Sequence, residues 1–345
     1  MSNNDSRFLK ACFQEEVDRT PVWFMRQAGR YLSEYRRLRE RYTLLDICMD
    51  PELAKEVTLQ PLRRFNLDAA IVFADILLPL KSLGISLDFV KGKGPVIQNP
   101  IRAPQMVYEL RLGNPEQDLS FVYETLRLVR NELDPKVALI GFAGAPFTVS
   151  SYIIEGGSSR NYIHTKRLML NHPEAWHRLM RNVTEVTQKY VRAQVEAGAQ
   201  AIQIFDSWVG CLNAKDYREY VQPYSKQIFN SLEDYTIPTI HFGTGTTSLL
   251  ELMKEAGGTV IGVDWRINLG DVWQRLGDQI SVQGNLDPVA LLSGTEPLRK
   301  KVDQVLEQAN NRPGHIFNLG HGILPQTPVE NVEAVVRWVH AKTRK

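Results

Sequence analysis

The sequence has little cysteine and almost no net charge. Its three cysteines, Cys12, Cys48 and Cys211, are far apart in the 345-residue chain, which excludes a disulfide framework and a Cys-x-x-Cys metal site. We therefore expect reduced, buried thiols. Because 41 Lys and Arg face 39 Asp and Glu, the net charge is +2, far below the basic excess typical of nucleic-acid-binding proteins.

Long apolar runs and export signals are also missing. No segment approaches the roughly 18 apolar residues of a membrane span, and the start of the chain lacks the charged-then-apolar pattern of a signal peptide. A hydrophobic content of 43% and a charged content of 23% are typical of globular proteins in aqueous solution. We expect a cytoplasmic protein that binds neither nucleic acid nor membranes.

Short segments rich in Val, Ile, Phe and Ala alternate with stretches of helical periodicity. Such β-α alternation, repeated eight times, predicts a TIM barrel, and the length suits one domain over residues 1–345. The eight predicted strands are 22–27, 69–77, 137–144, 201–208, 238–243, 259–265, 280–285 and 315–322.

Two of the intervening gaps, 78–136 and 145–200, are too long for a single helix, so the loops after the second and third strands must carry extra structure. In the first gap, residues 85–98 alternate around a Gly-Lys-Gly-Pro turn and predict an inserted hairpin. Within 119–133, apolar residues spaced by three and four predict an amphipathic helix.

Polar residues follow several predicted strands at their carboxyl ends, where TIM barrels carry their active sites. Asp75 lies in the apolar run IVFADILLPL, where an unpaired carboxylate costs several kcal/mol, so it is either a structural ion pair or a ligand-binding group. His321, between two glycines, is either a buried core histidine or an accessible site residue. Ser207 follows the fourth strand, and Tyr152 belongs either to the wall of a site or to the aromatic core.

The segment after the first strand, 26–41, holds six arginines. The planar donor fork of arginine suits carboxylates, so we expect an anionic ligand near Arg26 and Arg30. For the arginines further along the segment, the alternative is a solvated helix face on which they pair with neighbouring glutamates.

Six sequence blocks resemble the uroporphyrinogen decarboxylase family, among them PVWFMRQAGRYLSEYR and FNLGHGILPQTP. They run through nearly the whole chain in the order that the family has. The blocks are 21–36, 58–77, 141–157, 205–210, 283–288 and 317–328. The resemblance implies a distorted TIM barrel with extended loops after strands 2 and 3, usually a homodimer. It also implies an enzyme that needs no metal or organic cofactor. Such an enzyme removes carbon dioxide from the four acetate side chains of uroporphyrinogen, giving coproporphyrinogen in tetrapyrrole biosynthesis.

The resemblance further implies a set of site residues. Cations, hydroxyls and imidazole would receive the substrate carboxylates, and a single carboxylate would accept hydrogen bonds from the pyrrole N–H groups. Which group delivers the proton stays open. Catalytic roles fall to Arg26, Asp75, Tyr152 and His321, and these four contact substrate together with Arg30, Arg39, Phe205 and Ser207.

Two other functions compete with this interpretation. A zinc-dependent methyltransferase of the related barrel superfamily needs a His-x-Cys pair, whereas the corresponding stretch here is His241-Phe242-Gly243. A non-catalytic tetrapyrrole-binding protein is the second alternative, which an assay for decarboxylated products would distinguish.

Overall fold

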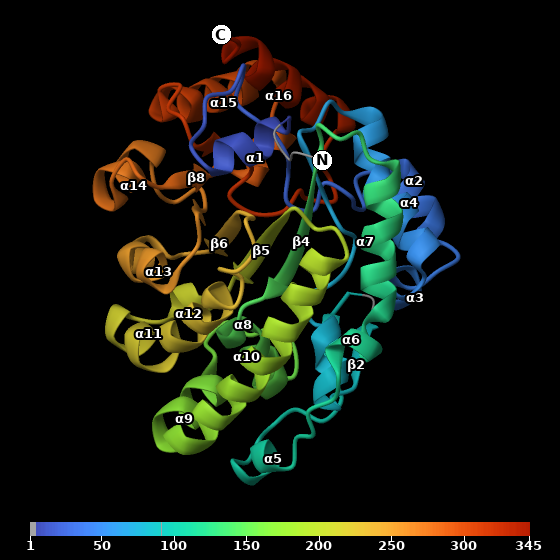
Figure 1. Cartoon of the computed structure of the whole chain (residues 1–345), viewed down its shortest axis with the longest axis vertical. Helices are drawn as coiled ribbons and strands as arrows, with labels where there is room; N and C mark the ends of the chain where they lie inside the picture. The colour runs from blue at the N-terminus through green and yellow to red at the C-terminus, as the bar shows by residue number, and fades with distance from the viewer. Residues whose placement is uncertain (1–4, 91) are drawn as a thin grey trace.

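The computed structural model describes residues 5–90 and 92–345, and a curved parallel sheet of seven strands lies at its centre (Figure 1). Strands that follow one another along the chain are neighbours in the sheet, which is the arrangement of a TIM barrel. The strands, in sheet order, are β1 (Ala69–Ile71), β4 (Ala138–Gly144), β5 (Ala201–Asp206), β6 (Thr239–Gly243), β7 (Val260–Gly262), β8 (Ser281–Gln283) and β9 (His315–Ile316).

The first predicted strand, 22–27, closes the barrel through a single bridged pair. Val22 bridges in parallel to Phe317, whose N–H donates to the carbonyl of Pro21 at 2.9 Å. On the other side, the N–H of Asp68 donates to the carbonyl of Val22 at 2.9 Å. The segment is shorter than predicted because the N–H groups of Phe24 and Met25 donate to the side chains of Gln27 and Asn318 and the chain turns sharply at Arg26. The other seven predicted segments each contain a regular strand, but β1 covers only 69–71 of 69–77 and β9 only 315–316 of 315–322. The fold is a distorted TIM barrel.

Helices cover the outside of the sheet (Figure 1). In the predicted amphipathic helix the apolar stripe is buried, as expected. The helices are α1 (Arg7–Cys12), α2 (Ser33–Arg39), α3 (Leu44–Met49), α4 (Pro51–Arg64), α5 (Gln105–Tyr108), α6 (Pro115–Asp118), α7 (Ser120–Glu132), α8 (Pro146–Glu155), α9 (Ile163–Asn171), α10 (Pro173–Glu196), α11 (Ala214–Tyr220), α12 (Gln222–Asn230), α13 (Leu250–Ala256), α14 (Leu269–Leu276), α15 (Thr295–Ala309) and α16 (Val329–Lys342). Short 3-10 helices are η1 (Leu78–Leu83), η2 (Val209–Cys211), η3 (Thr247–Leu249) and η4 (Pro288–Leu292).

The two long gaps carry the extra structure that their length predicts. After β1 come η1, an antiparallel hairpin and the short helices α5 and α6 before α7. The hairpin pairs β2 (Leu87–Val90) with β3 (Gly94–Ile97), and Lys91 at its turn lies outside the described residues. After β4, helices α8 and α9 precede α10, so both insertions leave the carboxyl-terminal ends of neighbouring strands.

Helix α1 covers the amino-terminal end of the barrel. Phe8 and Leu9 pack in one apolar cluster with Trp23 and with the first residues of several strands. The Ser281 hydroxyl, at the start of β8, donates to α1 carbonyl oxygens at 3.0 and 3.1 Å. Because this end is filled, the opposite end of the barrel is where a ligand can enter.

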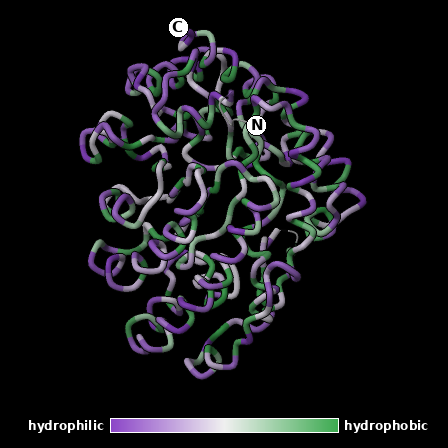
Figure 2. Tube along the Cα trace, viewed as in Figure 1, coloured by the Kyte–Doolittle hydropathy of each residue, from purple (hydrophilic) through white to green (hydrophobic). Residues whose placement is uncertain are grey.

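Hydrophobic residues gather along the inner strands and hydrophilic residues along the outer turns of the helices (Figure 2). Cys12 and Cys48 are buried and Cys211 is half-buried, all three as free thiols. In the described part of the chain, no helix combines the length and the apolar character that crossing a membrane requires.

Candidate active site

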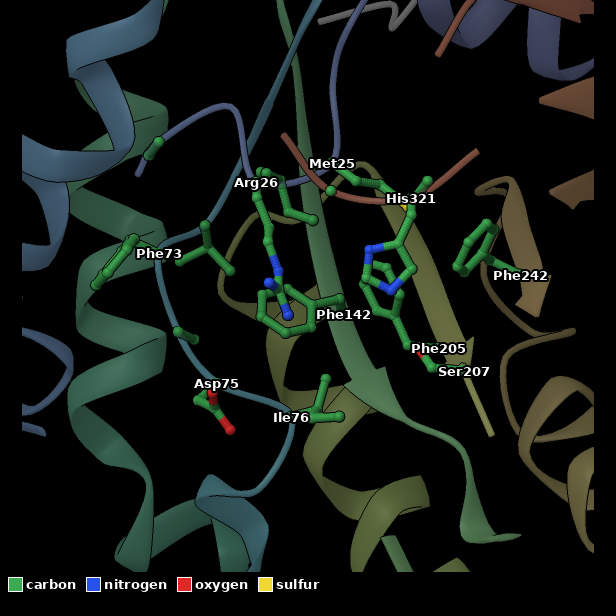
Figure 3. Close-up of a pocket in the computed structure, with 15 residues that line it drawn as sticks. Met25, Arg26, Phe73, Asp75, Ile76, Phe142, Phe205, Ser207, Phe242 and His321 are labelled. Atoms are coloured by element: carbon green, nitrogen blue, oxygen red, sulfur yellow. The ribbon is translucent and has the colours of Figure 1, made fainter. Parts of the chain in front are cut away.

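A cavity opens at the carboxyl-terminal end of the barrel (Figure 3). The space between its walls is about 820 Å³, with the open solvent at its mouth included. Most of its walls are apolar, and the polar side chains among them come from four different chain segments. Its lining consists of Met25, Arg26, Ala28, Ile71, Val72, Phe73, Ala74, Asp75, Ile76, Phe142, Phe205, Ser207, Phe242, His321 and Gly322.

Three phenylalanines from neighbouring strands form one wall of the cavity. Phe205 on β5 meets Phe142 on β4 edge to face, with ring centroids 5.6 Å apart, and Phe242 on β6 at 5.8 Å. Such a surface suits flat, ring-containing ligands. The sequence analysis missed Phe142 and Phe242. The signal was an aromatic residue one or two positions before the Gly or Asp that ends each of the three strands.

Arg26 enters the cavity from a sharp backbone turn. Its φ is 59°, in the left-handed region that residues other than glycine rarely adopt. The buried side chain of Gln27 holds the turn, because it accepts from the N–H of Phe24 at 3.1 Å and donates to the carbonyl of Ala69 at 3.1 Å. The Tyr31 hydroxyl donates to the carbonyl of Gln27 at 2.7 Å. The first strand segment and β1 together therefore fix the backbone position from which the Arg26 side chain extends.

Gly322 gives the Arg26 side chain its space. A Cβ at Gly322 would lie 2.4 Å from Cδ and 2.6 Å from Cγ of Arg26, closer than real contacts allow. The guanidinium therefore extends alongside His321 toward the side of the cavity where Asp75 lies (Figure 3). Gly322 must therefore be a glycine to leave room for the side chain of Arg26, which lies nearly three hundred positions earlier in the chain.

Asp75 lies half-buried on the loop between β1 and η1. One carboxyl oxygen accepts from the N–H of Leu77 at 2.9 Å. Burial raises the pKa of Asp75, while the Leu77 hydrogen bond and the positive charge of Arg26 act in the opposite direction. Among the described residues, no ion pair of 4.0 Å or less involves Asp75, so the geometry favours the ligand-binding interpretation over a structural ion pair.

His321 is uncharged at neutral pH. Burial, together with the positive charges of Arg26 and Arg266, lowers the pKa of its imidazole to about 4, and the negative charge of Asp264 acts in the opposite direction. A neutral imidazole has one donor and one acceptor nitrogen, which suits a carboxylate or a proton transfer. Ser207 lines the same cavity, and its carbonyl accepts a hydrogen bond from the Thr244 hydroxyl.

Three of the residues implied by the resemblance lie outside the lining. Arg30 and Arg39 are exposed, and Arg36 donates to the carbonyl of Arg30 at 2.9 Å. The Tyr152 ring stacks on Trp208, with centroids 3.8 Å apart. Burial raises the pKa of Tyr152 to about 12, and the charges of Asp75 and Arg26 also act on it. Tyr152 is therefore near the cavity, and its role, like those of Arg30 and Arg39, stays a prediction.

His241, the residue that the methyltransferase alternative would need, is a buried residue of β6. Its Nδ1 is 3.2 Å from the carbonyl oxygen of Met253, and the Phe229 ring packs on it at 4.8 Å. Within residues 5–90 and 92–345, no group of three His, Cys, Asp or Glu side chains could hold a metal ion. The described surroundings of His241 therefore supply no set of zinc ligands.

These features define a TIM-barrel protein with an apolar cavity that is flanked by a cation, a carboxyl and a neutral imidazole. The sequence model of the uroporphyrinogen decarboxylase family matches residues 3–342, so the chain belongs to that family. The chain is 57% identical to the uroporphyrinogen decarboxylase of Sorangium cellulosum, a match that covers 98% of this chain and 97% of that protein. It is 55% identical to that of Carboxydothermus hydrogenoformans, with 98% and 96% covered.

Solved structures confirm the fold. A methyltransferase from Methanosarcina mazei superposes with a TM-score of 0.76 at 20% identity, covering 98% of each chain. A B12-independent methionine synthase from Shewanella gives a TM-score of 0.54 at 8% identity, with 84% and 85% covered. At these identities the likeness shows a common barrel and carries no information about the reaction.

Proposed function

We propose that this chain decarboxylates the four acetate side chains of uroporphyrinogen to methyl groups, giving coproporphyrinogen in tetrapyrrole biosynthesis. One observation carries the proposal: the carboxyl of Asp75 and the guanidinium of Arg26 line the same largely apolar cavity. The names of the relatives at 48–57% identity support the same activity.

The substrate has hydrogen-bond donors at its centre and carboxylates at its rim, and the cavity offers an acceptor for the first and donors for the second. The pyrrole N–H groups at the centre of the macrocycle are donors, and a single carboxylate at Asp75 can accept from several of them. The acetates and propionates at the rim are anions, which the fork of Arg26 and the donors of Ser207 and His321 can bind. The exposed Arg30 and Arg39 would meet carboxylates at the mouth, and Tyr152 would complete one wall.

The reaction needs a place for the electron pair of the bond that breaks. A proton added to a ring carbon beside the acetate-bearing position turns the pyrrole into an iminium-like cation. The bond from the methylene carbon to the carboxylate then breaks, carbon dioxide leaves, and the electron pair neutralises the ring. Protonation of the methylene carbon and loss of the ring proton give the methyl group, so each acetate takes up one proton and releases one carbon dioxide.

In this scheme Asp75 acts electrostatically. Positive charge grows on the pyrrole in the transition state, and the carboxylate lies where that charge is stabilised more than in the ground state. Arg26 orients the departing carboxylate. A guanidinium is a poor acid, so Arg26 is not itself the proton donor but can hold a water that carries the proton.

The remaining expectations belong to the same proposal. We infer one functional domain over residues 1–345, a cytoplasmic location, a homodimer, and a reaction without metal or organic cofactor. The family match over 3–342 and the free thiols support the first two.

The deciding experiment incubates the purified protein anaerobically with uroporphyrinogen and separates the products with seven, six, five and four carboxyl groups by chromatography. The four-carboxyl product must accumulate, and adding a chelator must leave the rate unchanged. Binding of uroporphyrinogen without any product would reduce the protein to the non-catalytic carrier.

A further inference from the structure

Two hydrogen bonds of one buried hydroxyl join helix α8 to the end of β5 and the segment that follows it, beside the cavity. The Thr148 hydroxyl, on the first turn of α8, donates to one carboxyl oxygen of Asp206 at 3.0 Å. The same hydroxyl oxygen accepts from the N–H of Trp208 at 3.2 Å. Thr148 and Asp206 are fully buried, so the bond between them lies out of water, whereas the bond from Trp208 is partly buried.

These hydrogen bonds lie next to two of the proposed substrate contacts, Ser207 and Tyr152. Ser207 lies between the two residues that bond to Thr148, and its own carbonyl is held by the Thr244 hydroxyl. Tyr152 follows Thr148 by four residues on α8, which places both on one face of the helix. Its ring stacks on Trp208 with centroids 3.8 Å apart and an interplanar angle of 27°. One hydroxyl therefore connects the backbone of Ser207 to the ring that supports Tyr152.

Asp206 has a feature that simple packing does not explain. Its second carboxyl oxygen is buried and has no hydrogen-bond partner among the described residues. Burial raises the pKa of Asp206 to about 7, against the weaker effect of the Thr148 bond. A buried polar atom without a partner destabilises a fold, and the hydrogen bond that this carboxyl makes through its other oxygen is to the Thr148 hydroxyl.

We propose that Thr148 and Asp206 are positioning residues of this site: Asp206 holds the Thr148 hydroxyl, which fixes the Trp208 backbone and so orients Ser207 and the Tyr152 ring beside the cavity. The proposal rests on the proposed function for its kinetic consequences, but its structural part can be measured without substrate. Neither residue lines the cavity, so both act through their neighbours.

The test compares substitutions that remove or retain the hydroxyl. Thr148→Val keeps the shape and loses both bonds, whereas Thr148→Ser retains them. A misplacement of binding groups by about 1 Å can cost up to about a hundredfold, so we expect Thr148→Val to lower kcat/KM about tenfold and Thr148→Ser to restore it. The matched control is Thr125→Val on α7, because Thr125 is equally buried and bonds to the carbonyl of its own helix.

A second set of variants addresses the carboxyl. Asp206→Asn retains an acceptor for the Thr148 hydroxyl, and Asp206→Leu removes it. We expect Asp206→Leu to match the loss in Thr148→Val, Asp206→Asn to lose much less, and the double variant Thr148→Val/Asp206→Leu to lose no more than either single change, because residues of one network are not additive.

Tryptophan fluorescence supplies the readout that does not need activity. Thr148→Val must change the emission spectrum relative to the unmodified protein. In a protein that already carries Trp208→Phe, adding Thr148→Val must leave the spectrum of that variant unchanged. Wild-type kinetics in Thr148→Val, or a spectral change that persists without Trp208, would overturn the proposal. If the unmodified protein produces no coproporphyrinogen, the proposed function fails while the spectra still decide the positioning.

Discussion

Burial shifts the pKa values of Asp75 and His321 in opposite directions, in each case toward the neutral form. It raises the pKa of the Asp75 carboxyl and lowers that of the His321 imidazole to about 4. Arg26 acts on both, favouring the ionised carboxylate and the neutral imidazole. Arg26 thus opposes the effect of burial at Asp75 and adds to it at His321.

Asp75→Asn tests the electrostatic role directly. The amide keeps the size of the side chain but loses the negative charge that would stabilise the pyrrole cation, so kcat should fall about a hundredfold or more. Steady-state product formation measures this, and a thermal melt should show an intact fold. Asp303→Asn is the control, because Asp303 pairs with Lys342 at the surface at 2.7 Å. A kcat within about threefold of the unmodified protein would remove Asp75 from this role.

The His321 titration should depend on Arg26. With a pKa of about 4, His321 stays neutral as the pH falls from 8 to 5, and its ring signals in an NMR titration should not move over that range. Arg26→Gln removes a positive charge, so the pKa should rise toward the ordinary value of about 6.5. Burial and Arg266 still lower the pKa, so the rise should be partial. An unchanged titration in Arg26→Gln would show that the two side chains do not interact.

At the scale of elements, the sequence predicts the positions of the strands well but predicts poorly which apolar side chains line the cavity. Seven of the eight predicted segments contain a regular strand, because buried parallel strands are apolar runs that end in Gly or a polar residue. The segment 22–27 forms one bridge rather than a regular strand, because the N–H groups of Phe24 and Met25 bond to side chains and the chain turns at Arg26.

The polar members of the site could be found from sequence, and the apolar ones could not. Asp75 and His321 stand out because polar residues are unexpected among apolar neighbours. Phe142 and Phe242 look like ordinary core residues, and only the register of β4, β5 and β6 brings them together against Phe205. From its residue type Tyr152 fitted a site wall and the aromatic core equally, and its stack on Trp208 depends on a contact between α8 and the segment after β5 that no local pattern reveals.

Gly322→Ala tests how the strand ends constrain one another. The new methyl group would displace Arg26, since its position is 2.4 Å from Cδ of that side chain. We expect kcat/KM to fall about tenfold or more, with a small change in melting temperature because the arginine can move toward solvent. Gly270→Ala is the matched control, because a Cβ there meets nothing within 4 Å. Equal kinetics in both variants would contradict the role of Gly322 in placing Arg26.

At the scale of the whole molecule, one buried carboxylate joins the two ends of the chain to the barrel. Asp68, just before β1, accepts from the N–H of Val22 at 2.7 Å, from Arg7 on α1 at 2.5 Å and from His340 on α16 at 2.8 Å. Helices α1 and α16 lie near one another at this end of the barrel (Figure 1). No sequence pattern reveals such a cluster, since its members are separated by up to 333 positions, from 7 to 340.

Asp68→Asn should therefore destabilise the barrel without changing its chemistry. The amide leaves Arg7 and His340 without their buried anion, and breaking a buried pair typically costs about 3–5 kcal/mol. Asp18→Asn is the matched control, because Asp18 binds the same Arg7 at 2.5 Å but is 62% exposed, and exposed pairs contribute about 0–1 kcal/mol. Urea unfolding measures both. Because Asp68 lies at the end of the barrel opposite the cavity, kcat of the folded variant should equal that of the unmodified protein. Equal losses of stability in the two variants would mean that the closure depends on the backbone bridge at Val22 rather than on the charge of Asp68.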